Sequence, residues 1–303
     1  MTLQQLKYVV TVAKTGTITN AARELYISQP SLTNAIHELE KEMNIVIFQR
    51  TNKGIVLSRE GEDFLGYARQ VLEQAAILED KYKGQGGGKK QFCVSTQHYS
   101  FAVNAFVDLI KEYGQEEYDF SLRETQTYEI IEDVARMRSE IGILFLNDFN
   151  ESVIGKILKS SDLVFHELFI AKPHVFISRK HPLAGKNIIT NEELEAYPYL
   201  SFEQGEHNSF YFSEEIFSAS ERKKNIRVRD RATLFNLLIG LNGYTVCSGV
   251  IDKKLNGKDI IAVPLADESE MRIGYIMHRK GMTSRIGTTY LNALKKYMEP
   301  GIE

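Results

Sequence analysis

The sequence predicts a small all-α head that carries a β-hairpin, then a long helix, and then a larger α/β region. Residues 3–43 hold three short stretches with apolar residues at helical spacing. Residues 58–83 contain no proline and keep one apolar seven-residue repeat. From residue 91 onward, short apolar strands alternate with amphipathic helices, which predicts parallel sheets built from strand–helix–strand units.

The first two helices of the head have recognisable ends in the sequence. Gly16 ends the first helix, because glycine readily adopts the left-handed conformation that closes many helices. Thr17 or Thr19 caps the second helix, and the small pair Ala21–Ala22 allows a close approach to the third. The expected buried face of the first helix consists of Leu6, Val9, Val10 and Ala13.

The third helix opens with Ser28-Gln29-Pro30-Ser31. Ser28 is a good N-cap, and Pro30 falls in the first turn, where a missing N–H costs little. One side of this helix is apolar and consists of Leu32, Ala35, Ile36, Leu39 and Met43. The opposite side is polar and not acidic, with Pro30, Thr33, Asn34, His37 and Lys41. A short helix with one buried and one hydrogen-bonding side is typical of a DNA recognition helix.

Residues 45–57 predict a β-hairpin whose two apolar strands flank the turn Asn52-Lys53-Gly54. Arg50 and Lys53 place positive charge at the tip of this hairpin. Taken alone, the stretch Thr17–Glu40 fits any small helical pair as well as a helix-turn-helix. The hairpin that follows it favours a winged helix-turn-helix.

The head resembles the N-terminal domain of the LysR-type transcriptional regulators, and the length and layout of the rest also fit this family. The matching residues are Leu3-Gln4-Gln5-Leu6, Gly16-Thr17-Ile18-Thr19, Ala21-Ala22, Leu25, Ser28-Gln29-Pro30-Ser31-Leu32-Thr33, Ile36, Leu39-Glu40, Ile47-Phe48, Arg50 and Gly61. The resemblance implies that the third helix enters the DNA major groove and that the hairpin touches the backbone or minor groove.

The expected DNA contacts depart from the family pattern at one place. The family usually carries arginine or lysine where this chain has His37, and often glutamine or arginine where it has Asn34 or Ala35. We therefore expect base contacts from Gln29, Asn34 and His37, although a solvent-facing His37 is the simpler alternative. The full set of predicted DNA-binding residues is Thr17, Ser28, Gln29, Pro30, Ser31, Thr33, Asn34, His37, Arg50 and Lys53.

The long helix predicts self-association. Its apolar residues are spaced four and three apart in alternation, which is typical of two helices packed along their length. The predicted dimerisation residues are Phe64, Ala68, Val71, Ala75, Leu78 and Tyr82. An ordinary amphipathic helix that packs on its own domain is the alternative. The glycine-rich segment 84–90 then marks a flexible domain boundary.

The α/β region is expected to contain two Rossmann-like subdomains, because the resemblance implies an effector domain similar to periplasmic binding proteins. Strands are expected at 92–96, 118–122, 141–146, 163–170, 174–178, 199–203, 226–229, 245–248, 260–263 and 272–277, and the chain is expected to cross between subdomains near Ser161 and Asp267. The expected domains are 1–58 (winged helix-turn-helix), 59–84 (linker helix), 85–90 (hinge) and 91–303 (effector domain), with subdomain I at 91–161 and 268–303 and subdomain II at 162–267.

Ligands of such folds bind outside the carboxyl ends of the strands, near helix N-termini. This rule and the resemblance select Thr96, Gln97, His98, Ser100, Thr127, Phe202, Glu203, Gln204, Val246 and Ser248 as effector-binding residues. Neutral hydroxyl and amide donors suit a small acid or an amino-acid-like molecule. The alternative is that Thr127 only caps a helix and that Thr96 is a satisfied strand-end hydroxyl. Segments 96–99 and 244–249 further resemble a branch of Gram-positive regulators connected with sulfur amino-acid supply.

Charge and composition agree with a DNA-binding head on an acidic body. The formal net charge is −3, but residues 1–59 hold seven Lys/Arg against four Glu, so the head is positive and the remainder negative. No run approaches the roughly 18–20 apolar residues of a membrane span, and no N-terminal signal region is evident. The two cysteines, Cys93 and Cys247, are too few for a disulfide framework. We therefore expect a cytoplasmic protein.

No catalytic or metal-binding motif stands out. The histidines lack metal-ligand spacing, Cys93 lies inside a predicted strand, and Cys247 at a cleft edge is only a candidate redox sensor. The pairs Glu192-Glu193 and Glu214-Glu215 are interpreted as solvated helix faces. We expect no enzyme activity, no metal and no cofactor.

The sequence thus predicts a transcriptional regulator that binds operator DNA as a dimer or tetramer and responds to a small effector in the cleft. By resemblance, RNA polymerase is a further partner. The alternative is a solute-binding protein or an enzyme of the same cleft fold with a helical head that does not bind DNA.

Overall fold

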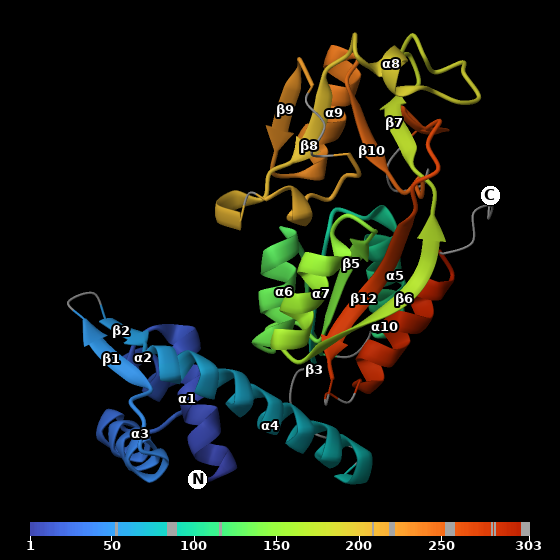
Figure 1. Cartoon of the computed structure of the whole chain (residues 1–303). Coiled ribbons are helices and arrows are strands. Elements are labelled where there is room, and N and C mark those ends of the chain that lie inside the picture. Colours follow the sequence, from blue (N-terminus) through green and yellow to red (C-terminus); the bar gives the residue numbers. More distant parts are fainter. Residues whose placement is uncertain are drawn as a thin grey trace. The chain divides into compact units, whose positions relative to one another are not determined.

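The structure is a computed structural model that describes residues 1–51, 54–83, 90–114, 117–207, 209–217, 222–251, 258–279, 281 and 283–297. The chain forms two compact units (Figure 1). The head comprises Met1–Gly88, and the α/β unit comprises Lys89–Glu303.

The head contains the three helices, the hairpin and the long helix in the expected order. Its elements are α1 (Leu3–Thr15), α2 (Ile18–Glu24), α3 (Gln29–Met43), β1 (Phe48–Thr51), β2 (Gly54–Leu57) and α4 (Arg59–Lys83). The predicted ends are confirmed: Gly16 closes α1 with φ +71°, and the Thr17 side chain caps α2 by accepting a hydrogen bond from the Asn20 N–H. Asn44 closes α3 in the same left-handed conformation.

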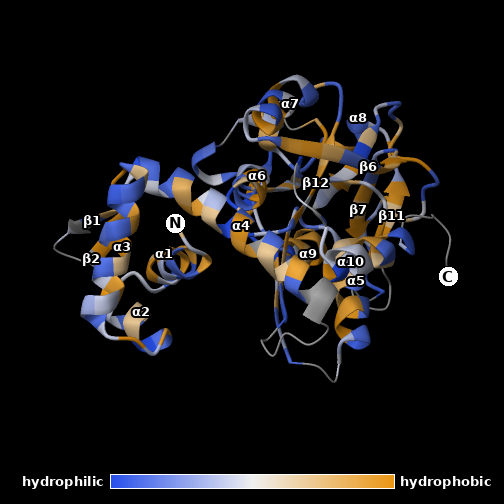
Figure 2. Cartoon of the chain, turned by 90° about the horizontal axis from the view of Figure 1, so that it is seen from below, coloured by the Kyte–Doolittle hydropathy of each residue, from blue (hydrophilic) through white to orange (hydrophobic). Residues whose placement is uncertain are grey.

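Two clusters of apolar side chains hold the head together. Leu32 and Ile36 of α3 pack with Val12, Ala21 and Ala22, whereas Leu39 packs with Val9, Ile47 and Leu65. Along α3 and α4, hydrophobic and hydrophilic residues alternate in Figure 2, as expected of helices with one buried side. The start of α4 lies so close to the hairpin that a Cβ at Gly61 would overlap the backbone of Ile47.

The α/β unit contains two five-stranded sheets. The first sheet has the order β4 (Tyr118–Glu124), β3 (Lys90–Thr96), β5 (Ile141–Leu146), β12 (Met271–His278), β6 (Leu163–Ala171). Helices α5 (Ser100–Glu112), α6 (Thr127–Ala135), α7 (Glu151–Ser160) and α10 (Arg285–Lys295) pack with it. Every residue of the central strand β5 is buried, because helices cover both faces of this sheet (Figure 1).

The second sheet has the order β11 (Ile260–Pro264), β7 (His174–Ser178), β10 (Tyr244–Cys247), β8 (Tyr199–Phe202), β9 (Asn225–Val228). It is accompanied by α8 (Asn191–Leu194), α9 (Arg231–Leu241) and the 3₁₀ turns η1 (Gly205–His207) and η2 (Phe210–Phe212). Both sheets are mixed rather than purely parallel, because β12 runs antiparallel to β5 and β6, and β7 runs antiparallel to β10 and β11.

Two expectations about this unit are wrong. Strand β6 pairs with β12 along its length, so Leu163–Ala171 belongs to the first sheet, and the chain crosses to the second sheet after residue 171 rather than near Ser161. The pair Glu214-Glu215 does not lie on a helix as expected, because among the described residues of this stretch only the turn η2 is helical. Within the described ranges, no helix is long and apolar enough to cross a membrane.

Candidate DNA-binding face and ligand cleft

The polar side of α3 lies exposed on the head. The exposed predicted residues are Ser28, Gln29, Pro30, Ser31, Asn34 and His37. The Ser28 hydroxyl accepts a hydrogen bond from the Ser31 N–H (3.2 Å), which fixes the helix N-terminus. The opposite side of α3 is anchored by Leu32, Ile36 and Leu39, so the exposed side has a fixed orientation on the head.

Two of the predicted contact residues use their hydroxyls inside the head. The Thr33 side chain is partly buried and donates to the Gln29 carbonyl oxygen (2.9 Å). Thr17 caps α2 through the Asn20 N–H (3.2 Å). Gln29 and Asn34 are both exposed, so their amides are better placed for base recognition than either threonine, although the Gln29 amide oxygen also accepts a hydrogen bond from the Thr19 hydroxyl (3.2 Å).

His37 is tied to its own helix by Glu40. The His37 Nδ1 atom lies 3.2 Å from Glu40 Oε2. The other carboxylate oxygen of Glu40 accepts hydrogen bonds from the Ile47 N–H (2.8 Å) and the Phe48 N–H (3.0 Å), at the start of the hairpin. This arrangement holds one edge of the imidazole and leaves the ring on the exposed side of α3.

Three predicted residues fall at the edge of what the structure describes. Lys53 lies outside the described residues. The backbones of Arg50 and Tyr82 belong to β1 and α4, but their side chains also lie outside the description. The roles assigned to these three side chains remain predictions.

Helix α4 divides its apolar residues between the head and solvent. Ala68 is buried, and Phe64 packs against the cluster that contains Leu65. Val71 and Leu78 are 41% and 59% exposed, although both are large apolar side chains. Tyr67, which the sequence analysis did not select, is 68% exposed one turn before Val71. The outward-facing part of the predicted seam therefore begins near residue 67.

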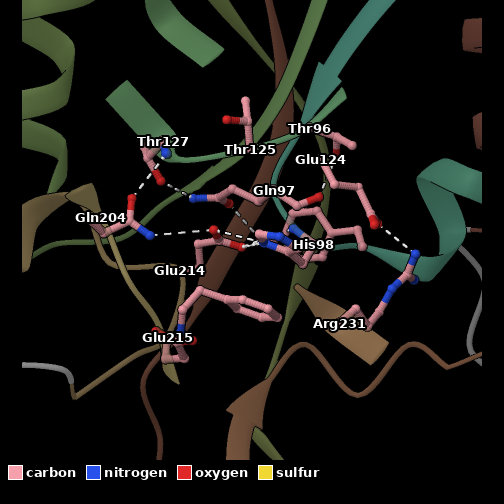
Figure 3. Close-up of polar contacts among 12 residues, drawn as sticks. Thr96, Gln97, His98, Glu124, Thr125, Thr127, Gln204, Glu214, Glu215 and Arg231 are labelled. Carbon is pink, nitrogen blue, oxygen red and sulfur yellow. Dashed lines mark hydrogen bonds and ion pairs between the residues drawn. The ribbon is translucent and has the colours of Figure 1, made fainter. Parts of the chain in front are cut away.

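In the α/β unit, a network of buried side chains joins the ends of the two sheets across a cleft (Figure 3). Gln97, fully buried after β3, donates from Nε2 to the Thr127 hydroxyl (2.7 Å). Its Oε1 atom accepts from the Phe145 N–H (3.1 Å). Gln204 of the second subdomain accepts from the Thr127 N–H (3.1 Å), at the first residue of α6. Three predicted residues are thus brought together in one continuous hydrogen-bond network.

His98 forms the second connection across the cleft. Its backbone N–H donates to Glu214 Oε2 (2.9 Å), and its Nδ1 atom lies 2.9 Å from the same oxygen. Its ring stacks on Phe202 with centroids 3.8 Å apart. Gln204 Nε2 also reaches Glu214 (3.4 Å), so the His98–Glu214 bridge and the glutamine network meet at one carboxylate.

The electrostatics of the bridge favour a charged imidazole. Burial disfavours the imidazolium form, but the charge and hydrogen bond of Glu214 outweigh this effect and raise the net pKa of His98 above its ordinary value. For Glu215, in contrast, the surroundings favour the neutral form of the side chain. Burial, followed by repulsion from Glu214, raises the pKa of the Glu215 carboxyl well above its ordinary range.

The interpretation of Glu214-Glu215 as a solvated helix face is therefore wrong. Both side chains are buried, at 7% and 4% exposure, because this segment is not a helix and turns inward toward the cleft. The pair stands between Phe212 and Ile216, and two adjacent acidic residues gave no signal that could distinguish a buried pair from an exposed one. Glu214 is buried against His98, which lies 116 positions earlier in the chain, and Glu215 accepts a hydrogen bond from the Phe202 N–H.

A third connection across the cleft joins Arg231 to Glu124. Arg231 Nη2 donates to Glu124 Oε1 (2.6 Å), between the first residue of α9 and the last residue of β4. Both residues were missed by the sequence analysis, although each stands at an element end that faces the cleft. The cleft retains a cavity of about 50 Å³, whose lining includes His98, Glu214 and Arg231.

The other predicted cleft residues take smaller roles. Ser100, Phe202, Val246 and Ser248 line the cavity, whereas Thr96 is fully buried and donates to the Gln97 carbonyl oxygen (2.7 Å). Thr96 therefore matches its structural alternative, a satisfied strand-end hydroxyl. Glu203 faces outward to an ion pair with Arg229.

The cysteines and carboxylates offer little for redox or metal chemistry. Burial is the main cause that raises the pKa of both the Cys93 and the Cys247 thiols, so neither is poised as a reactive thiolate. Among the described residues, no group of three or more His, Cys, Asp or Glu side chains could hold a metal ion.

The fold, the exposed recognition helix and the two-sheet cleft together define a helix-turn-helix regulator with a ligand-binding domain. Comparison with known families agrees. The profile of the bacterial regulatory helix-turn-helix proteins of the lysR family matches residues 3–62, and that of the LysR substrate binding domain matches residues 92–298. The chain belongs to the LysR family of DNA-binding transcriptional regulators.

Similar proteins extend over the whole chain. The RuBisCO operon transcriptional regulator of Allochromatium vinosum is 26% identical over 290 residues, which is 93% of this chain and 91% of that protein. A full-length OxyR variant from Pseudomonas aeruginosa has a TM-score of 0.68 at 20% identity, covering 97% of this chain and 98% of that one. CbnR in complex with its target DNA has a TM-score of 0.57 at 17% identity, covering 98% and 100%.

The two family profiles establish the predicted family, and the similar structures support the predicted fold class. Their names do not bear on sulfur amino-acid supply, so that suggested branch stays a prediction. The structural similarities to OxyR and CbnR, both below 25% identity, concern the fold alone.

Proposed function

We propose that α3 reads operator DNA mainly through Gln29 and Asn34, with Ser28, Pro30, Ser31 and His37 completing the contact surface. The observation that carries this proposal is the exposed polar side of α3, held from behind by buried leucine and isoleucine. Amide side chains can form paired hydrogen bonds with adenine in the major groove. Arg50 and Lys53 of the hairpin are assigned to the DNA backbone or minor groove.

Substitution of the two amides tests this assignment. Gln29→Ala and Asn34→Ala should each weaken binding to the preferred duplex by about 1–3 kcal/mol and relax base preference. Gln4→Ala removes an exposed amide from α1, outside the α3 surface, and serves as the matched control. Fluorescence anisotropy with the preferred duplex measures the loss of affinity, and comparison with a scrambled duplex measures the loss of base preference. If both amide variants discriminate as well as wild type, the contact surface lies elsewhere.

We also propose that two heads are held together by the exposed part of α4. Tyr67, Val71 and Leu78 lie at heptad spacing and are exposed apolar side chains, with Ala75 between the last two. Phe64 and Ala68 support this surface from inside the head, and Tyr82 extends the predicted seam. A dimer doubles the number of DNA contacts, which compensates for the modest positive charge of one head. We further propose that two such dimers assemble into a tetramer.

For the α/β unit, we propose that a small effector binds in the cleft and replaces contacts of the His98–Glu214 bridge and the Gln97–Thr127–Gln204 network. These contacts join the two subdomains directly, so a ligand that competes with them changes how the subdomains are held. A ligand shifts such an equilibrium only through its different affinity for the two arrangements. The buried carboxylate of Glu214 disfavours a simple anion, so an amino-acid-like molecule with an ammonium group suits the cleft better than a plain acid.

The cleft proposal has a direct test in the full chain. A thermal-shift screen with amino acids, their acetylated forms and aromatic acids should reveal a stabilising compound. The double variant Thr96→Val/Thr127→Val should lose this shift and keep DNA binding, because the Thr127 hydroxyl belongs to the network that bridges the cleft. Thr233→Val on α9, whose hydroxyl bonds Asp230 instead, is the control. An unchanged shift in the double variant moves the effector site elsewhere.

RNA polymerase contact and a cytoplasmic location complete the proposal and follow from the regulator class. The relatives are regulators. Among the described residues we find no catalytic arrangement that would support the alternative of an enzyme, and the helix-turn-helix head does not favour a solute-binding protein.

A further inference from the structure

A second cavity lies on the other side of the Glu214–Glu215 segment. Its volume is about 290 Å³, compared with about 50 Å³ for the cleft cavity. It is formed by residues that follow β5, by the segment from η2 to Phe217, and by residues 269–270 before β12. None of the predicted effector-binding residues lines it, and Glu215 is the one described residue that lines both cavities.

The charged lining of this cavity is entirely acidic among the described residues. Asp148 and Glu270 are exposed at its edge, and Glu215 lines it from the buried side. No lysine, arginine or histidine is among the described lining residues. The cation beyond Glu270, Arg272, is engaged by Glu151 (2.5 Å). The cavity therefore presents negative charge that its own lining does not neutralise.

Glu215 carries the most specific signal. It is 4% exposed, and its Oε1 atom accepts a hydrogen bond from the Phe202 N–H (2.8 Å). Its Oε2 atom has no hydrogen-bond partner among the described residues, which is costly for a buried polar atom. In Figure 3 the Glu214 side chain reaches toward His98, whereas that of Glu215 lies away from it. Arg222, the nearby cation, donates to the Phe217 carbonyl oxygen (3.1 Å) and lies over the Tyr199 ring.

Aromatic side chains complete the cavity. Phe149 and Phe210 are 47% and 53% exposed, and Phe149 stacks on Tyr211 with centroids 4.7 Å apart. Phe217 lines the cavity from the second subdomain. Exposed aromatic groups around a concave site are typical of ligand binding, and their ring faces attract cations.

We propose that this second cavity binds a small organic cation, a primary amine carried on an aromatic or apolar body. The ammonium group hydrogen-bonds the free oxygen of Glu215, Asp148 and Glu270 add favourable charge, and the phenylalanines contact the body. Burial and the neighbouring Glu214 raise the pKa of the Glu215 carboxyl, so the empty protein favours its protonated form more than water does. Binding of the ammonium ion stabilises the carboxylate, so the carboxyl proton passes to the buffer as the ligand binds.

Isothermal titration calorimetry of the full chain tests the proposal with phenethylamine and phenylpropionate, which share a ring and differ in charge. Only the amine should bind, and its apparent enthalpy should depend on the ionisation enthalpy of the buffer, as proton release requires. Glu215→Gln should weaken amine binding at least about tenfold and abolish the buffer dependence. The assay contains no DNA, so its outcome is independent of the proposed regulatory function.

Two further variants locate the ligand. Asp148→Asn/Glu270→Gln changes exposed side chains only and should lower the amine affinity severalfold without affecting folding. Ser248→Ala, which lines the cleft cavity and not the second one, should leave the affinity unchanged. The proposal is wrong if the amine does not bind at millimolar concentration or if phenylpropionate binds equally well. It is also wrong if Ser248→Ala loses amine binding while Asp148→Asn/Glu270→Gln keeps the wild-type affinity.

Discussion

Replacement of Glu214 by glutamine isolates the charge in the His98–Glu214 bridge. Glutamine keeps an acceptor oxygen and nearly the same shape, but it removes the negative charge that His98 contacts twice at 2.9 Å. Hydrogen bonds to a charged group contribute about 1 kcal/mol more than neutral ones. Two such contacts predict a loss of about 2 kcal/mol. The raised pKa of the Glu215 carboxyl reduces the repulsion that this substitution could relieve.

The expected readouts are a lower melting temperature and a flatter pH dependence. For a unit of this size, a loss of about 2 kcal/mol lowers the melting temperature by about 6 °C. The pKa of His98 is raised in the folded state, so the bridge stabilises fully below the ordinary value of 6.5 and loses this stabilisation as pH rises through the folded value. The variant should lose the part of the wild-type pH dependence that comes from His98.

Differential scanning calorimetry of the full chain from about pH 5.5 to about pH 9 measures both effects, because this range brackets the titration of a histidine with a raised pKa. Glu203→Gln is the matched control, because its partner Arg229 is 81% exposed and such surface pairs contribute about 0–1 kcal/mol. A Glu214→Gln variant that melts like the control and keeps the wild-type pH profile would refute the reasoning.

Two other predictions concern the head. Gly61→Ala should destabilise the head by several kcal/mol, because the added Cβ overlaps the Ile47 backbone. Gly66→Ala has open space around the added Cβ and should stabilise α4 by about 0.5–1 kcal/mol. Urea unfolding compares the two variants. Leu78→Glu should shift sedimentation toward the monomer, because it places a charge in an exposed apolar surface, and an unchanged dimer would remove residue 78 from the interface.

Local chemistry made the head predictable. The turn at Gly16, the caps at Thr17 and Ser28, and the two sides of α3 all follow from interactions within a few residues. The α/β unit was less predictable, because pairing partners are distant in sequence. Nothing in Leu163–Ala171 distinguishes a strand that pairs with β12 of the first sheet from one that begins the second sheet.

In the cleft, too, some contacts were predictable from the sequence and others were not. Strand-end geometry correctly brought Gln97, Thr127 and Gln204 together, because the carboxyl ends of the strands meet at the cleft. The sequence did not indicate that Glu214 faces His98, since this contact depends on how two separate subdomains pack. It also placed Thr96 among the ligand contacts, although its hydroxyl is satisfied within its own strand end.

The central claim is that α3 of this chain reads a DNA sequence. Its most direct test is the binding of the full chain to duplex DNA selected from a random pool, measured over a series of salt concentrations. The account predicts an enriched sequence that binds more tightly than its scrambled control, with affinity falling as salt rises because phosphate contacts release counterions. Failure to enrich any sequence, or equal affinity for selected and scrambled duplexes at every salt concentration, would contradict it.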